Sequence, residues 1–177
     1  MIWPRQGPEP ASARQIEVAQ GAFAVSDDPN TELCATLGSC VAVCLFAPQK
    51  GIGAMNHIFQ NVSAGAMGEA VVVAEVERLV NALMRRGVPR SEMHARVAGG
   101  AKVLLRGKMH GLAMAEVCLR YLEEERIPLQ GLSIGGEQAR RIQFHPVTGK
   151  LTVGMLAKVR FDDLPTQTPK GNAPEMF

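Results

Sequence analysis

The stretch LGSCVAVCLFAPQKGIGAMNH, from Leu37 to His57, decides how the chain is interpreted. After Cys40 comes a run of small and branched apolar residues, which is typical of a buried strand. The segment Ala-Pro-Gln-Lys at 47–50 predicts a turn, and the residues from Gly51 to Ile58 predict a return strand. The sequence therefore predicts a β-hairpin whose first strand is buried.

The register of this hairpin brings a thiol and an imidazole together. A two-residue loop at Pro48–Gln49, or a four-residue loop from Ala47 to Lys50, makes Cys40 the direct cross-strand partner of His57. Directly opposed side chains share one face of the sheet, with Cβ atoms about 4.5–5.5 Å apart, so sulfur and ring nitrogen can reach each other. A loop of odd length would instead put the two side chains on opposite faces.

Such a pair is a nucleophile with its base. The imidazole takes the thiol proton, and the thiolate attacks an sp² carbon such as an amide carbonyl. The residues before the thiol, Gly38 and Ser39, and the N–H of Cys40 are candidates to hold the developing oxyanion. The alternative is that Cys40 is simply a small buried apolar residue, as we expect for Cys34, Cys44 and Cys118.

The rest of the pattern predicts an α+β fold with two main helices and mostly hairpin-paired strands. Helices are predicted at Glu69–Arg86 and Leu112–Arg126, each with apolar residues at helical spacing. Strands are predicted at Gln15–Val25, Met93–Ala98 and Leu129–Ile134, and in a second hairpin formed by Arg141–His145 and Leu151–Val159.

Length and composition predict one domain. The 177 residues are 46% hydrophobic and 20% charged, with 19 basic and 17 acidic residues. Residues 15–163 are predicted to form the domain, and the proline-containing segments 1–14 and 164–177 to be flexible. A net charge of +2 gives no strong attraction to nucleic acid or anionic lipid. We therefore expect no nucleic-acid partner.

The sequence has no pattern typical of a membrane-spanning segment, an export signal or a zinc site, and this bears on cellular location and metal binding. The longest apolar run, Cys40 to Ala47, is far shorter than the ~20 residues of a membrane-spanning helix. The first residues have no export-signal pattern, so we expect a cytoplasmic protein with no membrane span and reduced thiols. The four cysteines form no C-x-x-C pair and no histidine pair has zinc-site spacing, so no metal is expected.

The segments Leu37–Leu45 and Gly51–His57 closely resemble the CheD family, the chemoreceptor glutamine deamidases of bacterial chemotaxis. Two further blocks match in order: Val97-Ala-Gly-Gly-Ala101, and Gly135-Gly136 with Arg140 four positions later. The matches run from about residue 18 to residue 159. The LGSC and MNH segments are the specific part of the resemblance.

The resemblance implies that Cys40 is the nucleophile and His57 its base, with no metal or organic cofactor. The implied substrate is a glutamine side chain on the cytoplasmic helices of a chemoreceptor, a methyl-accepting chemotaxis protein, and the implied intermediate is a thioester. Similar proteins fold as a layered α/β/β sandwich. Some relatives also bind CheC, a phosphatase of the response regulator, so a CheC-type phosphatase is an expected partner.

The chain departs from the family at several positions. The family's third catalytic residue is a threonine six positions before the cysteine, where this chain has Cys34. Thr36 shares the side of Cys40 by strand parity and is a candidate to orient His57, although Cys34 or another group could do so. An acidic residue common before the second glycine pair is Ser133 here.

These departures keep two other functions open. One is a regulatory binding module for receptors or a CheC-type phosphatase, with a vestigial active site. The other is a cysteine hydrolase that acts on a small amide or peptide.

Overall fold

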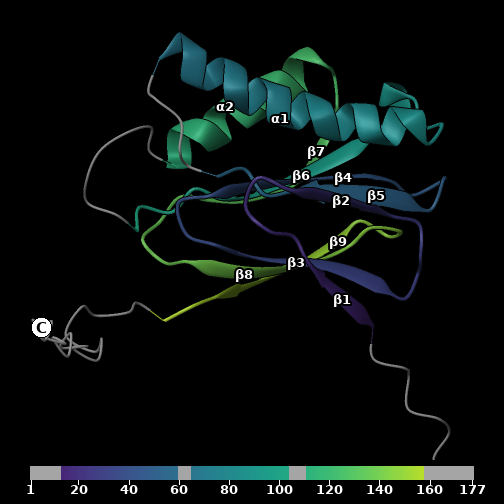
Figure 1. Ribbon diagram of the computed structural model, residues 1–177, viewed down its shortest axis with the longest axis horizontal. Coiled ribbons are helices and arrows are strands. Elements are labelled where there is room, and N and C mark those ends of the chain that lie inside the picture. The colour runs from purple at the N-terminus through teal and green to yellow at the C-terminus, as the bar shows by residue number, and fades with distance from the viewer. Residues whose placement is uncertain (1–12, 60–64, 104–110, 158–177) are drawn as a thin grey trace, which may run out of the picture.

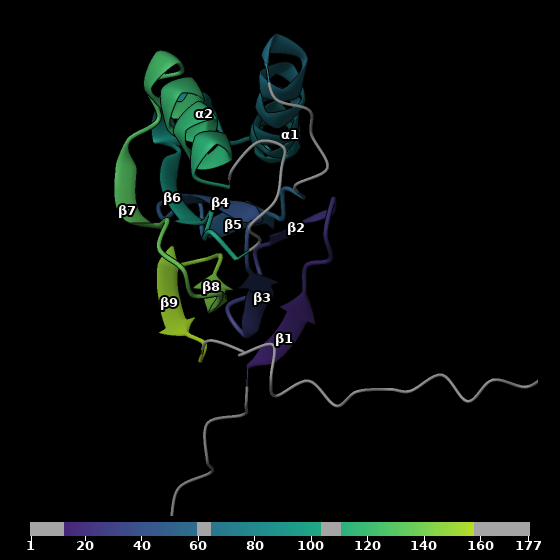
Figure 2. The same ribbon diagram turned by 90° about the vertical axis from the view of Figure 1, so that its left-hand side faces the viewer.

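The computed structural model describes residues 13–59, 65–103 and 111–157, and these residues form three layers (Figures 1 and 2). Two helices cover one face of a five-stranded sheet, and a four-stranded sheet packs against its other face. This arrangement confirms the predicted α+β fold and its α/β/β layering. The predicted segments 1–14 and 164–177 lie outside the described residues, apart from residues 13 and 14.

Within the described residues, none of the helices is long and apolar enough to cross a membrane.

The order in the five-stranded sheet is β2-β5-β4-β6-β7 and in the four-stranded sheet β1-β3-β8-β9. The strands are β1 Arg14–Glu17, β2 Phe23–Ser26, β3 Thr31–Leu37, β4 Val41–Ala47, β5 Ile52–Asn56, β6 His94–Gly99, β7 Leu129–Ile134, β8 Arg140–His145 and β9 Lys150–Met155. The helices are α1 Ala66–Arg85 and α2 Gly111–Glu124, with a short 3-10 turn at Arg90–Glu92.

Strand β4 lies at the centre of the molecule and is buried along its whole length. Val41, Val43 and Leu45 face the helices and join the apolar cluster that includes Val72 of α1. The alternate residues, including Ala42 and Cys44, face the four-stranded sheet and belong to a second cluster. A strand covered on both faces needs an unbroken apolar sequence, which explains the composition of this segment.

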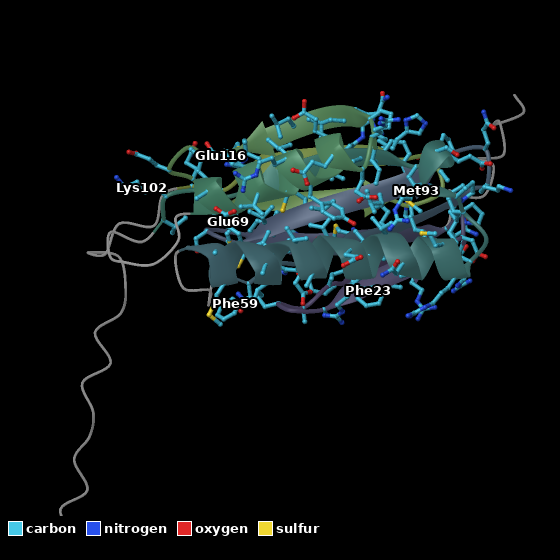
Figure 3. All side chains as sticks on the ribbon, turned by 90° about the horizontal axis from the view of Figure 1, so that it is seen from above. Phe23, Phe59, Glu69, Met93, Lys102 and Glu116 are labelled. Carbon is cyan, nitrogen blue, oxygen red and sulfur yellow. The ribbon has the colours of Figure 1, made fainter. Side chains whose placement is uncertain are left out.

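The two helices lie side by side across the sheet (Figure 3). The apolar positions predicted for the first helix are buried, and the helix ends where Gly87 takes a φ of +81°. The Gly87 N–H donates to the carbonyl of Met84 at 2.9 Å. Near the start of α1, Glu69 accepts a hydrogen bond from Arg120 of α2 at 2.8 Å.

The predicted strand Gln15–Val25 is wrong, because it is two strands in different sheets. A turn from Ala19 to Ala22 separates β1 from β2, with Gly21 at a φ of +75°. No strand was predicted at β3, whose apolar residues alternate with polar ones. Hairpin pairing holds for β4–β5 and β8–β9, whereas β1–β3 and β6–β7 are parallel.

Candidate active site

The loop Gly38–Cys40 enters β4 at one end of the five-stranded sheet, and the end of β6 holds it there. Gly100 donates its N–H to the Cys40 carbonyl at 2.8 Å, and Ala101 donates to the Gly38 carbonyl at 3.0 Å. A Cβ at Gly99 would lie 2.2 Å from the Cys40 carbonyl oxygen, so only glycine allows this approach. The first glycine pair of the sequence is therefore a backbone support for the loop.

The first residue of α2 supports the loop from a second direction, since a Cβ at Gly111 would lie 2.3 Å from the Ser39 carbonyl oxygen. No described peptide bond is cis, so each N–H points opposite to the carbonyl of the preceding residue. The Ser39 N–H therefore points away from Ala101, and the Cys40 N–H away from Gly111. Neither Gly38 nor Ser39 donates its N–H to a backbone carbonyl of the described residues.

The hairpin register differs from the predicted one by two residues. Ala47 pairs with Ile52, and an isolated bridge joins Val41 to Ile58, so Cys40 is not directly opposite His57. The prediction was wrong because the four-residue loop begins at Pro48 and ends at Gly51, whose φ of +62° closes the turn. A loop centred one residue later along the chain moves every partner by two positions.

A shift of two residues preserves the face on which each side chain lies. Cys40 and His57 flank the Val41–Ile58 bridge as diagonal neighbours, and both face the four-stranded sheet, because Val41 and Ile58 face the helices. The residue directly opposite His57 is Ala42, whose small side chain leaves room beside the ring. Both side chains are almost buried, Cys40 with 6% and His57 with 5% of its surface exposed.

Backbone groups of the β1–β2 connection hold His57. Its Nδ1 lies 2.9 Å from the Val18 carbonyl oxygen, which can only accept a hydrogen bond. Nδ1 therefore carries the proton of the neutral ring, and Nε2 carries the lone pair. Nε2 is buried and has no hydrogen-bond partner within the described part of the chain. The main chain of His57 also bonds to Gly21 and Ala22, at 2.8 and 3.0 Å.

The structure does not bring Thr36 to His57. Thr36 is exposed on β3 in the four-stranded sheet, and its hydroxyl accepts a hydrogen bond from Arg141 at 3.3 Å. The predicted shared side of Thr36 and Cys40 was wrong, because the chain passes from one sheet to the other between Leu37 and Val41. The Val18 carbonyl occupies the orienting position instead. Cys34 lies on the same side of β3 as Thr36, away from the five-stranded sheet. Its side chain is nevertheless buried, and burial raises the pKa of its thiol.

Sequence reasoning missed Gln20. This exposed residue lies in the turn between β1 and β2, and its Nε2 donates to the Cys40 sulfur at 3.9 Å. A turn can be predicted from Gly21, but no local pattern shows that it lies against Cys40. The contact depends on the pairing of β2 with β5.

The other three cysteines are buried, as predicted, and none of the four forms a disulfide. Burial raises the pKa of the Cys118 thiol to about 12 and raises that of Cys44 still further. Both thiols therefore stay protonated at neutral pH. Among the residues described, no three His, Cys, Asp or Glu side chains gather as ligands for a metal.

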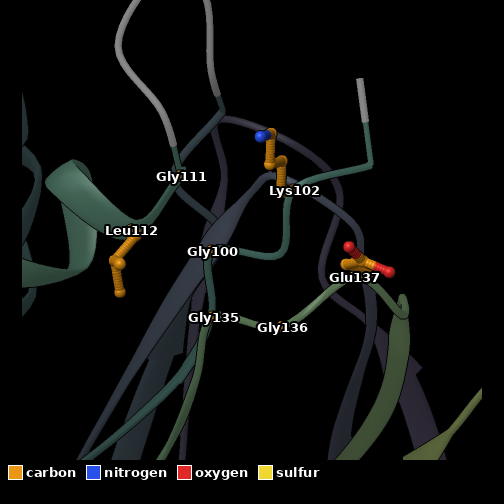
Figure 4. Close-up of a pocket in the computed structure, with 7 residues that line it drawn as sticks. All are labelled: Gly100, Lys102, Gly111, Leu112, Gly135, Gly136 and Glu137. Atoms are coloured by element: carbon orange, nitrogen blue, oxygen red, sulfur yellow. The ribbon is translucent and has the colours of Figure 1, made fainter. Parts of the chain in front are cut away.

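A pocket of about 360 Å³ lies beside the glycine support (Figure 4). Both glycine pairs contribute to its wall, together with the first residues of α2, but neither Cys40 nor His57 lines it. Gly135 donates its N–H to the Gly99 carbonyl at 2.9 Å and so links the two glycine pairs, and Lys102 donates its N–H to the Gly136 carbonyl at 2.8 Å. The lining residues are Gly100, Lys102, Gly111, Leu112, Gly135, Gly136 and Glu137.

The sequence is similar to a known family. Residues 69–155 match the family model described as CheD chemotactic sensory transduction. A protein of Rhizobium etli named probable chemoreceptor glutamine deamidase CheD is 38% identical over 144 residues, which is 78% of each chain. A protein of Rhizobium rhizogenes with the same name is 34% identical over 94% of this chain and 98% of its own.

Among solved structures, the chain is similar to YlmD from Geobacillus stearothermophilus, with a TM-score of 0.45 and 13% identity. The similarity covers 64% of this chain and 50% of that one.

Proposed function

Because the chain belongs to the CheD family, we propose that it is a protein-glutamine deamidase that converts glutamine side chains of chemoreceptors to glutamate. In this proposal Cys40 is the nucleophile and His57 its base. The observation that carries it is the buried Nε2 of His57, which presents a lone pair on the sheet face that Cys40 also occupies.

The first step moves one proton and forms one bond. His57 Nε2 takes the proton of the Cys40 thiol and becomes an imidazolium, stabilised by its Nδ1–H bond to the Val18 carbonyl. The thiolate attacks the carbonyl carbon of the substrate carboxamide, and the π electrons move to the oxygen. The N–H groups of Gly38, Ser39 and Cys40 are the candidates to hold that oxyanion.

The second step releases ammonia. The oxyanion re-forms the carbonyl, the carbon–nitrogen bond breaks, and His57 delivers its proton to the departing nitrogen. The product on the enzyme is a thioester between Cys40 and the former glutamine. His57 then takes a proton from water, the hydroxide attacks the thioester, and sulfur leaves as the thiolate. In total, glutamine and water give glutamate and ammonia, with no oxidant or reductant.

The proposal also includes the cellular location of the protein and a second partner. Receptor glutamines on cytoplasmic helices require a cytoplasmic enzyme. A CheC-type phosphatase is a further proposed partner, which co-purification of the two proteins would test.

The proposal is tested by incubating the protein with a cytoplasmic receptor fragment from its own host. Mass spectrometry should find a mass increase of about 1 Da at specific receptor glutamines, because an amide becomes an acid. Cys40→Ala should remove this conversion. The proposal fails if no receptor fragment of the host is converted, or if Cys40→Ala converts at the rate of the wild type.

A further inference from the structure

The β1–β2 connection contacts both members of the proposed catalytic pair. Val18 orients the His57 ring, Gly21 and Ala22 hold its main chain, and Gln20 reaches the Cys40 sulfur. All four of these contacts come from the segment of five consecutive residues 18–22. The β1–β2 connection is itself fixed to the four-stranded sheet, because Val18 donates its N–H to the Cys34 carbonyl of β3 at 2.8 Å.

The turn fixes the direction in which Gln20 points. Ala22 donates its N–H to the Ala19 carbonyl at 3.0 Å, and Gly21 has a φ of +75°. A positive φ at the third turn position is typical of a type II turn, which favours glycine there. Gln20 is the second residue of this turn, and from there its carboxamide lies against the sulfur.

We propose that the Gln20 carboxamide is a catalytic hydrogen-bond donor, whose N–H stabilises the thiolate of Cys40. This inference rests on the proposed function, because it assigns Gln20 a role in the same reaction. The neutral thiol is a weak acceptor, which agrees with the long Nε2–Sγ distance of 3.9 Å. A thiolate is a charged and stronger acceptor, so the same N–H favours the ionised form.

The expected gain in rate is small and can be calculated. Lowering a thiol pKa by one unit raises the thiolate population about tenfold at neutral pH, while intrinsic nucleophilicity falls by about a factor of three. The net gain is about threefold. Gln20 is exposed, so replacing it should not disturb the core.

The experiment measures the rate of Cys40 alkylation by iodoacetamide as a function of pH, with peptide mass spectrometry to identify the modified cysteine. This reaction needs no receptor and so reports on Gln20 even if deamidation fails. The variants are Gln20→Ala and Gln20→Glu. Gln15 is another exposed glutamine, on β1, and Gln15→Ala and Gln15→Glu are the matched controls.

We expect Gln20→Ala to move the midpoint of the alkylation profile upward by about half to one pH unit and to slow alkylation at neutral pH about threefold. Gln20→Glu should move it further, because a carboxylate repels the thiolate. The Gln15 variants should leave the midpoint unchanged. The titratable and charged groups on neighbouring described segments, including Glu17, His57, Lys102, Glu137 and Arg140, are the same in every variant, so a shift reports on Gln20.

Two results would overturn the inference. One is faster alkylation of Gln20→Ala at every pH with the same midpoint, which would mean that Gln20 only covers the sulfur. The other is a gain of about 1 Da at Gln20 in the wild type that disappears in Cys40→Ala, which would make Gln20 a substrate. A midpoint shift without receptor conversion would overturn the proposed function and leave the donor role of Gln20 intact.

Discussion

Cys40 and Cys44 face the same side of the same sheet, four residues apart, yet their surroundings differ. Cys44 lies in the middle of β4 opposite Met55 and is fully buried, and burial raises the pKa of its thiol. Cys40 lies just before β4 begins, near His57 and against the carboxamide of Gln20.

The difference shows that place along the strand, and not residue type or face, separates a structural cysteine from a candidate nucleophile. In the middle of the strand the second sheet covers the side chain. Just before the strand begins, Cys40 is still almost buried in the same apolar cluster, but the Gln20 carboxamide lies against its sulfur and the His57 ring shares its face.

Replacing the two cysteines in turn should give the largest contrast. Cys40→Ala should lower receptor deamidation by a thousandfold or more, because the nucleophile is lost. Cys44→Ala should retain most of the activity and lower the free energy of unfolding by about 1 kcal/mol, because it removes one buried atom. Deamidation rates and urea unfolding measure both effects. Equal loss of activity in the two folded variants would contradict the comparison.

Replacing the base should have the next largest effect. His57→Asn keeps an N–H donor at the position of Nδ1 for the Val18 carbonyl but removes the basic ring nitrogen Nε2, so kcat should fall about 10²- to 10⁴-fold with little change in KM. His94→Asn is the control, because His94 pairs with Phe46 at the other end of β4. Steady-state kinetics with a receptor fragment would test this, and a comparable fall in His94→Asn would argue against a specific role for His57.

Alkylation should discriminate between the cysteines of the wild type. At neutral pH, iodoacetamide should label Cys40 about a hundredfold faster than Cys44 or Cys118, because the reactive form is the thiolate and burial raises the pKa of the Cys44 and Cys118 thiols. Quantitative peptide mass spectrometry measures the three rates. Uniform labelling would favour the vestigial-site alternative.

The smallest effect concerns stability at alkaline pH. Burial raises the pKa of Cys118 from 9.0 to about 12, so between these values the unfolded chain loses its proton while the folded chain keeps it. This thiol's contribution to stability is complete below pH 9 and falls as pH rises, by about 1.4 kcal/mol per unit. Cys118→Ala should therefore be less stable than the wild type at pH 7, and above pH 9 the difference should shrink and then close or reverse by pH 11. The prediction would be contradicted if the difference in unfolding free energy between the wild type and Cys118→Ala were the same at pH 7 and at pH 11.

The fold could be predicted where local pattern determines structure. Both helices, the buried strand β4, the strand β7 and the β8–β9 hairpin follow from apolar spacing and from glycine and proline signals. The division of Gln15–Val25 between two sheets could not be predicted, because nothing local distinguishes one long strand from two short ones with different partners.

The candidate site likewise combines features that could be predicted from the sequence with features that could not. That Cys40 and His57 share a face depends only on an even loop length, because side chains alternate along a strand, and the sequence by itself determined this. The register, the Val18 carbonyl at His57 and the Gln20 contact with the sulfur were decided only by the tertiary structure. These contacts join segments up to 39 residues apart in the chain, and their geometry depends on how the two sheets and their connections pack.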